Sequence, residues 1–178
     1  MLEDGTRFDG KAIGASGTTT GEVAFNTGMY GYQEIFTDPS YKGQVLVMAT
    51  AHIGNYGVHS AENESGSTQI AGLVVRNFSE VASRAGDVET LADRLERDGI
   101  VGIADIDTRG LIQHIRDCGA MNALISNDGT PEEELMTRLK ETPSMEGLEL
   151  SSRVTRPEAE DAGDAGSDVR IALLDLGN

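Results

Sequence analysis

The sequence predicts an α/β fold, and two stretches predict it most directly. Residues 44–49 (QVLVMA) form a continuous apolar run of strand length, which is typical of a strand buried on both faces of a sheet. Residues 100–106 (IVGIADI) form a second strand that runs directly into Asp107, a good helix N-cap. Buried strands joined to capped helices indicate the α/β class.

The N-terminal residues predict three short elements in turn. Residues 2–8 hold an Asp-Gly turn between apolar ends, which predicts a hairpin, and residues 12–15 continue as a strand. We expect residues 17–21 (GTTTG) to form a loop.

Residues 21–41 (GEVAFNTGMYGYQEIFTDPSY) are the stretch around which the chain is organised. They begin as a strand with Val23 and Phe25 on one face, and a glycine then allows a turn. Tyr30, Tyr32 and Phe36 follow closely, although aromatic residues are only 4% of the chain. This concentration predicts one packed aromatic hub.

The hub is followed by a rigid polar turn, Asp38-Pro39-Ser40. The side chain of Asp38 can accept a hydrogen bond from the backbone two residues on, and Pro39 presets its own φ. Ser40 is left with a free hydroxyl. We therefore expect a hydrogen-bonding corner at Ser40, which lacks the adjacent base that a nucleophilic serine needs.

The later elements are expected at short intervals. Strands are predicted at 70–75, 100–106 and 122–126, with loops at 52–57, 61–67 and 79–86. Helices are predicted after the N-caps Asp87, Asp107 and Thr130, the last with a capping box. In the first of these helices, Asp93 and Arg97 are expected to pair across one turn.

Composition limits the partners and the compartment. The chain has 30 acidic residues against 14 Lys and Arg, a net charge of −16, which argues against nucleic acid and anionic membranes as partners. Scarce lysine beside abundant Asp and Glu suggests a protein of a halophile. A single cysteine, no signal peptide and no apolar run of ~20 residues predict a cytoplasmic protein without disulfides or membrane spans.

The chain offers few candidates for nucleophilic or metal chemistry. Cys118 lies on the apolar stripe of the helix after Asp107, which favours a buried structural thiol over a nucleophile. His52 and His59 lack metal-binding spacing, and His114 with Cys118 makes a pair too small for a zinc site. The structural interpretation is favoured for all of them.

Two carboxylates and an acidic run give weaker signals. Asp105 and Asp107 would point the same way on a strand, as paired carboxylates in metal or acid–base sites do, but capping explains Asp107 better. Residues 132–134 (EEE) fit a helix start. We expect no catalytic residue, metal or cofactor in this segment.

The composition changes near the C-terminal end. Residues 153–168 have no large apolar side chain apart from one valine and are rich in acidic residues, Gly and Ala, which is typical of a linker. Residues 169–176 (VRIALLDL) return to a strongly apolar pattern and predict a buried strand. We expect residues 169–178 to begin a truncated second α/β domain.

Four motifs in order carry a resemblance to a known family: LEDGT at 2–6, the stretch 21–41, HIGNYG at 52–57 and GIADIDTRGL at 102–111. Together they resemble the N-terminal domain of the small, glutamine-hydrolysing subunit of carbamoyl-phosphate synthase. The resemblance implies a three-layer β/β/α fold with mixed sheets over residues 1–152. It also implies that residues 169–178 are the first strand of a class I glutamine amidotransferase domain.

The resemblance further implies a function. In this family, a Cys-His-Glu site in the second domain releases ammonia from glutamine. A large subunit then forms carbamoyl phosphate from ammonia, bicarbonate and ATP, for arginine and pyrimidine synthesis. The N-terminal domain contributes much of the contact with that large subunit, which is therefore the expected partner, and Ser40 matches a glutamine-binding position.

The Gly-x-Cys-x-Gly setting of the family's nucleophile is absent from these residues, so the segment alone is expected to be inactive. Two alternatives stay open beside the enzyme subunit. One is a non-catalytic assembly module that only docks the large subunit. The other is a stand-alone metal-dependent enzyme that uses Asp105 and Asp107.

Overall fold

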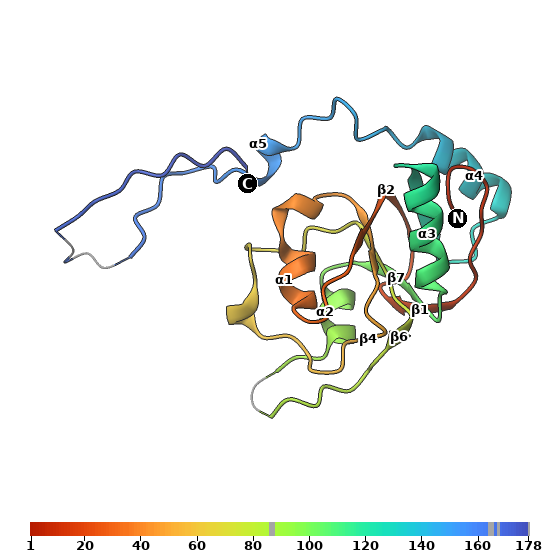
Figure 1. The fold of residues 1–178 in the computed structure, drawn as a ribbon, viewed down its shortest axis with the longest axis horizontal. Coiled ribbons are helices and arrows are strands. Elements are labelled where there is room, and N and C mark those ends of the chain that lie inside the picture. The colour runs from red at the N-terminus through yellow and green to blue at the C-terminus, as the bar shows by residue number, and fades with distance from the viewer. Residues whose placement is uncertain (86–87, 164–165, 167, 178) are drawn as a thin grey trace.

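The computed structural model describes residues 1–85, 88–163, 166 and 168–177, and its centre is a six-stranded sheet (Figure 1). The strand order is β1-β7-β5-β3-β2-β8. The strands are β1 (Lys11–Gly14), β2 (Thr18–Asn26), β3 (Val45–Met48), β5 (Gly72–Val74), β7 (Val101–Ala104) and β8 (Asn122–Ser126). The four inner strands are parallel and both edge strands are antiparallel to their neighbours, so the predicted mixed sheet is confirmed.

Helices and a second, small sheet surround this central sheet. The small sheet is the parallel pair β4 (His52–Ile53) and β6 (Asn77–Phe78). The helices are α1 (Tyr32–Thr37), α2 (Leu91–Arg97), α3 (Thr108–Cys118), α4 (Glu132–Glu141) and α5 (Ser151–Val154). Two single 3-10 turns, η1 (Pro39–Tyr41) and η2 (Ser60–Glu62), complete the elements.

Strand β3 shows how the layers are built, because its side chains alternate between two separate cores. Leu46 and Met48 pack with the apolar side chains of α1, α2 and β4. Val45 and Val47 pack on the opposite face, with Leu111 and other side chains of α3. All four strand residues are at most 2% exposed, which confirms that residues 44–49 contain a strand buried on both faces.

The central sheet therefore lies between two layers. One contains α1, α2 and the β4–β6 pair, and the other contains α3 and the N-terminal residues. Within the described residues, the expected second sheet is this two-stranded pair, and short helices supply the rest of its layer.

Two expectations for the first 21 residues are corrected. Residues 18–20 were expected in a loop but begin β2, because β8 pairs with them from Thr18↔Ser126 onward. The Asp-Gly turn is present, since the Gly5 amide donates to the Leu2 carbonyl (2.9 Å). No hairpin strand follows the turn, and Leu2 instead forms a bridge with Ala123.

The helix starts differ from expectation at two places. Asp87 lies outside the described residues, and the N-cap of α2 is Thr90, whose side chain accepts from the Asp93 amide (3.1 Å). Arg97 pairs with Glu89 rather than with Asp93. The prediction of a capping box at the start of α4 is wrong. The Thr130 hydroxyl donates to Asp128 (2.6 Å), and no side chain caps that helix.

Beyond α5 the chain leaves the domain and folds back on itself (Figure 1). The described residues between 155 and 177 form no strand, so the buried strand predicted at 169–176 is not confirmed. Ile171, Leu173, Leu174 and Leu176 are 63–92% exposed. Within the described residues, no helix is both long and apolar enough to cross a bilayer.

At Gly21, the backbone of β2 lies very close to the backbone of the turn before β3. A Cβ atom at Gly21 would lie 2.3 Å from the Gly43 carbonyl oxygen, which is backbone and cannot rotate away. We expect Gly21→Ala to lower the free energy of unfolding by about 1–3 kcal/mol, measured by urea denaturation. Gly66→Ala is the control, because a Cβ there meets nothing within 4 Å; an equal loss in both variants would contradict the steric account.

Candidate functional site

The predicted polar corner is present at the end of α1. The Asp38 carboxylate accepts a hydrogen bond from the Ser40 amide at 2.8 Å, as the sequence predicts. The amides of Tyr41 and Lys42 donate to the carbonyls of Asp38 (3.1 Å) and Pro39 (3.0 Å), which closes the turn η1. The corner is therefore closed by hydrogen bonds within five consecutive residues, 38–42.

Longer-range contacts fix the corner against the sheet. The Tyr41 hydroxyl accepts from the Asn26 side-chain amide (2.9 Å), which connects η1 to the end of β2. Thr37, fully buried at the end of α1, donates to the Gln33 carbonyl (2.8 Å) and accepts from the Glu64 amide (2.9 Å). The end of α1 is thus held on both sides before the chain reaches Ser40.

The aromatic hub packs at α1, the helix that precedes this turn, and one member differs from the expected set. Tyr32 and Phe36 are 2% and 1% exposed, but Tyr30 is 84% exposed. Its place is taken by Tyr56, whose ring stacks on Tyr32 with centroids 4.2 Å apart. Tyr56 belongs to the predicted loop 52–57, which the structure brings back to α1.

Hydrogen bonds complete the hub. The Tyr56 hydroxyl accepts from the Gly31 and Tyr32 amides (2.9 and 3.1 Å), so it caps the start of α1. The Tyr32 hydroxyl donates to the Gly57 carbonyl at 2.7 Å. Burial raises the pKa of Tyr32 above its ordinary value, so this hydroxyl stays a neutral donor.

Ser40 is exposed at the tip of the corner. Among the described residues, no group bonds its hydroxyl, whereas its amide is engaged by Asp38. The hydroxyl can therefore donate to or accept from a ligand without breaking an internal hydrogen bond. With no base bonded to it, the arrangement suits binding rather than nucleophilic attack.

Asp105 and Asp107 do not form a carboxylate pair. Asp105 has a positive φ of 62° and forms an ion pair with Lys11 (2.8 Å). Asp107 caps α3 by accepting from the Gly110 amide (3.1 Å), which confirms the capping interpretation. The group of donors that could share a metal ion in the described part of the chain contains neither residue.

Cys118 is exposed, which corrects the expected buried thiol. Cys118 is the last residue of α3. Leu111 and Ile115, earlier on the same apolar stripe, pack in the core, and the end of the stripe extends past it. His114 contacts Asp4, with 2.6 Å between Nε2 and Oδ2. Asp4, His114 and Cys118 thus gather on the surface, a group that the sequence could not show because Asp4 lies 110 residues away from His114.

The other two histidines have separate surroundings. The Nδ1 atom of His59 accepts from the Ala61 amide (3.2 Å) and starts η2, which is a structural role. His52 is exposed in β4. Neither belongs to a group of potential metal ligands in the described residues.

The fold and the corner define an α/β domain with a buried aromatic hub at α1 and an exposed hydrogen-bonding turn at the end of that helix. Residues 1–125 match the family model described as carbamoyl-phosphate synthase small chain, CPSase domain. The chain therefore belongs to this family.

Curated relatives agree with the family model. The carbamoyl phosphate synthase small chain of Akkermansia muciniphila is 42% identical over 179 residues, which cover 98% of this chain and 48% of that protein. The small chain of Escherichia coli is 45% identical over 160 residues, 89% of this chain and 42% of that protein. That of Salmonella typhimurium is 45% identical over 159 residues, 89% and 42% respectively. The chain thus spans less than half the length of these relatives.

The corner yields a prediction about which of its groups are structural. We expect Asp38→Ala to lower the free energy of unfolding by about 1 kcal/mol, because the Ser40 amide loses its acceptor. We expect Ser40→Ala to stay within about 0.5 kcal/mol of the parent, because no internal bond depends on its hydroxyl. Urea denaturation of both variants measures this, and a larger loss in Ser40→Ala would show that the hydroxyl is structural.

Proposed function

We propose that this chain is the N-terminal part of a glutamine-hydrolysing small subunit of carbamoyl-phosphate synthase. The family match over residues 1–125 is the observation that supports it most strongly. In this proposal the subunit releases ammonia from glutamine and passes it to a large subunit. There, bicarbonate and ATP are consumed to form carbamoyl phosphate for arginine and pyrimidine synthesis in the cytoplasm.

The chemistry of glutamine hydrolysis belongs, in this proposal, to residues beyond this segment. The relatives are more than twice as long as the portion that this chain matches. We assign residues 1–152 to the N-terminal domain, 153–168 to a linker and 169–178 to the first strand of the amidotransferase domain. The exposure of Ile171, Leu173 and Leu174 supports this assignment, because such side chains are normally covered when strands pair.

Ser40 is the residue we propose to contact glutamine. The exposed hydroxyl on a fixed turn supports this role, since a ligand can bind it without disturbing α1 or the hub. Glutamine carries donors and acceptors in its amide and in its α-amino and α-carboxylate groups, and a serine hydroxyl can serve either kind. The corner would act by positioning the substrate at a site that another domain provides.

A non-catalytic assembly module is the alternative, in which this segment only docks the large subunit. The absence of a nucleophile at the corner favours neither proposal, because the enzyme proposal also puts the chemistry elsewhere. The effect of Ser40 on glutamine kinetics separates the two.

A chimera tests the proposal directly. We would replace the matching segment of the Escherichia coli small chain with that of this chain, and purify the product with its large subunit. We expect co-purification and glutamine-dependent carbamoyl phosphate formation. We expect Ser40→Ala in the chimera to reduce kcat/KM for glutamine at least tenfold, which corresponds to the loss of about 1.4 kcal/mol of binding.

Ser60→Ala is the matched control, because Ser60 is also an exposed serine at a 3-10 turn. It should leave glutamine kinetics unchanged. Activity with added ammonia should stay constant in all variants, because ammonia bypasses glutamine binding. A chimera that co-purifies and works equally well with Ser40→Ala would leave only the assembly module.

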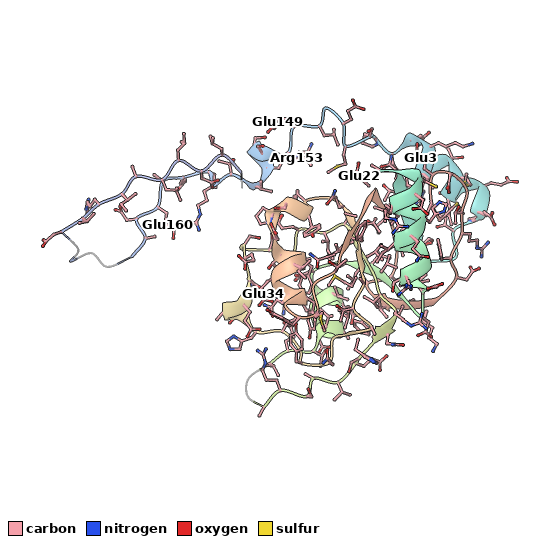
Figure 2. The ribbon with its side chains drawn as sticks, in the orientation of Figure 1. Glu3, Glu22, Glu34, Glu149, Arg153 and Glu160 are labelled. Atoms are coloured by element: carbon pink, nitrogen blue, oxygen red, sulfur yellow. The ribbon has the colours of Figure 1, made fainter. Side chains whose placement is uncertain are left out.

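We also propose that the protein is adapted to high salt. The net charge of −16 supports this, and only Lys11, Lys42 and Lys140 are lysines. Acidic side chains such as Glu3, Glu22, Glu34 and Glu149 are spread over different sides of the molecule (Figure 2). Repulsion among such charges destabilises the compact state and is weakened by salt.

The expected outcome is a rise in the urea midpoint between dilute buffer and about 1 M KCl, where the Debye length falls to about 3 Å. A triple variant tests whether acidic charge is the cause: Glu133→Gln with Glu146→Gln and Glu158→Gln. All three residues are exposed and have no ion pair in the described structure. The midpoint of this variant should depend less on salt. Two results together would contradict a salt requirement: a full near-UV circular dichroism signal in dilute buffer, and a urea midpoint that is the same in dilute buffer and in KCl.

A further inference from the structure

The surface group of Asp4, His114 and Cys118 has no role in the proposed function. It joins two segments, the N-terminal turn and the end of α3, which lie side by side (Figure 1). One ligand atom from each residue lies within 4.8 Å of the other two. An imidazole nitrogen, a thiol sulfur and a carboxylate oxygen are therefore directed to one place.

Each side of the group is fixed by its own local structure. The Thr6 amide donates to Asp4 Oδ1 at 2.8 Å, so Oδ2 is the oxygen that meets His114. The Leu2 amide donates to the Thr6 carbonyl (2.8 Å), which closes the turn that carries Asp4. The carboxylate is thus oriented before any cation arrives.

Helix α3 supplies the other two donors on one face. His114 and Cys118 are four residues apart, a spacing that places side chains one above the other along a helix. Gly119, with φ of 94°, ends the helix directly after Cys118. The thiol is therefore exposed and can rotate toward His114.

We propose that Asp4, His114 and Cys118 form a binding site for one zinc-type divalent cation, with water as the fourth ligand. Nitrogen and thiolate donors select such cations over Mg²⁺ and Ca²⁺, which take oxygen ligands. Around tetrahedral zinc, donor atoms lie roughly 3.4–3.8 Å apart, so closure needs side-chain shifts on the order of 1 Å. The cation takes the place of the proton that His114 Nε2 shares with Asp4 and of the thiol proton. Both protons leave to solvent, and the neutral imidazole carries its own proton on Nδ1.

Two electrostatic features support this site. The hydrogen bond from the Thr6 amide, together with the contact to His114, lowers the pKa of Asp4, so the carboxylate is ionised at neutral pH. The net charge of −16 attracts cations to the surface generally. A bound cation would connect the N-terminal turn to α3 and stabilise the folded state, because the unfolded chain does not hold the donors together.

Cobalt titration of the whole chain, without a histidine tag, tests the proposal. Cys118 is the only cysteine, so a thiolate-to-cobalt charge-transfer band reports this site alone. We expect one equivalent of Co²⁺ to give the band, Zn²⁺ to abolish it by displacement, and affinity to rise with pH. A phosphine reductant keeps the thiol reduced without binding the metal.

Variants separate a built site from chance binding to a thiol. Cys118→Ser should abolish the band, and His114→Ala and Asp4→Asn should each weaken Co²⁺ binding at least tenfold. His52→Ala is the control, an exposed histidine outside the group, and should bind as the parent does. Absence of the band, or parental affinity in His114→Ala and Asp4→Asn, would overturn the proposal. Far-UV circular dichroism establishes that each variant is folded, and Cys118→Ser alters only an exposed side chain.

Discussion

The two-sided burial of β3 is the constraint on which the rest of the structure depends. A strand with apolar side chains on both faces needs cover on both, and α1 with α2 provides one cover while α3 provides the other. Because β2 and β3 are parallel, the chain must cross over between them, and α1 and η1 form that crossover. The corner at Ser40 is thus a direct consequence of how β3 is paired.

The corner is held by local and distant contacts together. Asp38 fixes the turn from within, whereas Tyr41 and Thr37 connect it to β2 and to the loop that contains Glu64. The stacked pair Tyr32 and Tyr56 anchors the start of α1, where the Tyr56 hydroxyl accepts from the Gly31 amide. A hydroxyl presented in this way loses little conformational freedom when a ligand binds, which is the physical basis for a positioning role.

Features whose cause lies within a few residues could be predicted from the sequence. The Asp38 turn, the Asp107 cap and the strand at 45–48 each follow from neighbouring side chains, and all are present. The candidate residue Ser40 could be identified for the same reason, as the exposed member of a local turn. Glutamine, the ligand we propose for Ser40, could not be identified in this way, because that assignment rests on the family resemblance.

Tertiary structure decided the features that depend on residues far apart in the chain. Residues 18–20 look like a loop until β8, more than a hundred residues later, pairs with them. Cys118 continues an apolar stripe, but the core beneath α3 includes Leu111 and Ile115 and not Cys118, whose thiol is exposed. The approach of Asp4 to His114 has the same cause. The sequence by itself determined the Asp38 turn, the Asp107 cap and the buried strand at 45–48, because their hydrogen bonds and periodicities are local. Only the tertiary structure decided strand partners, exposure and side-chain groups, because these depend on which distant segments pack together.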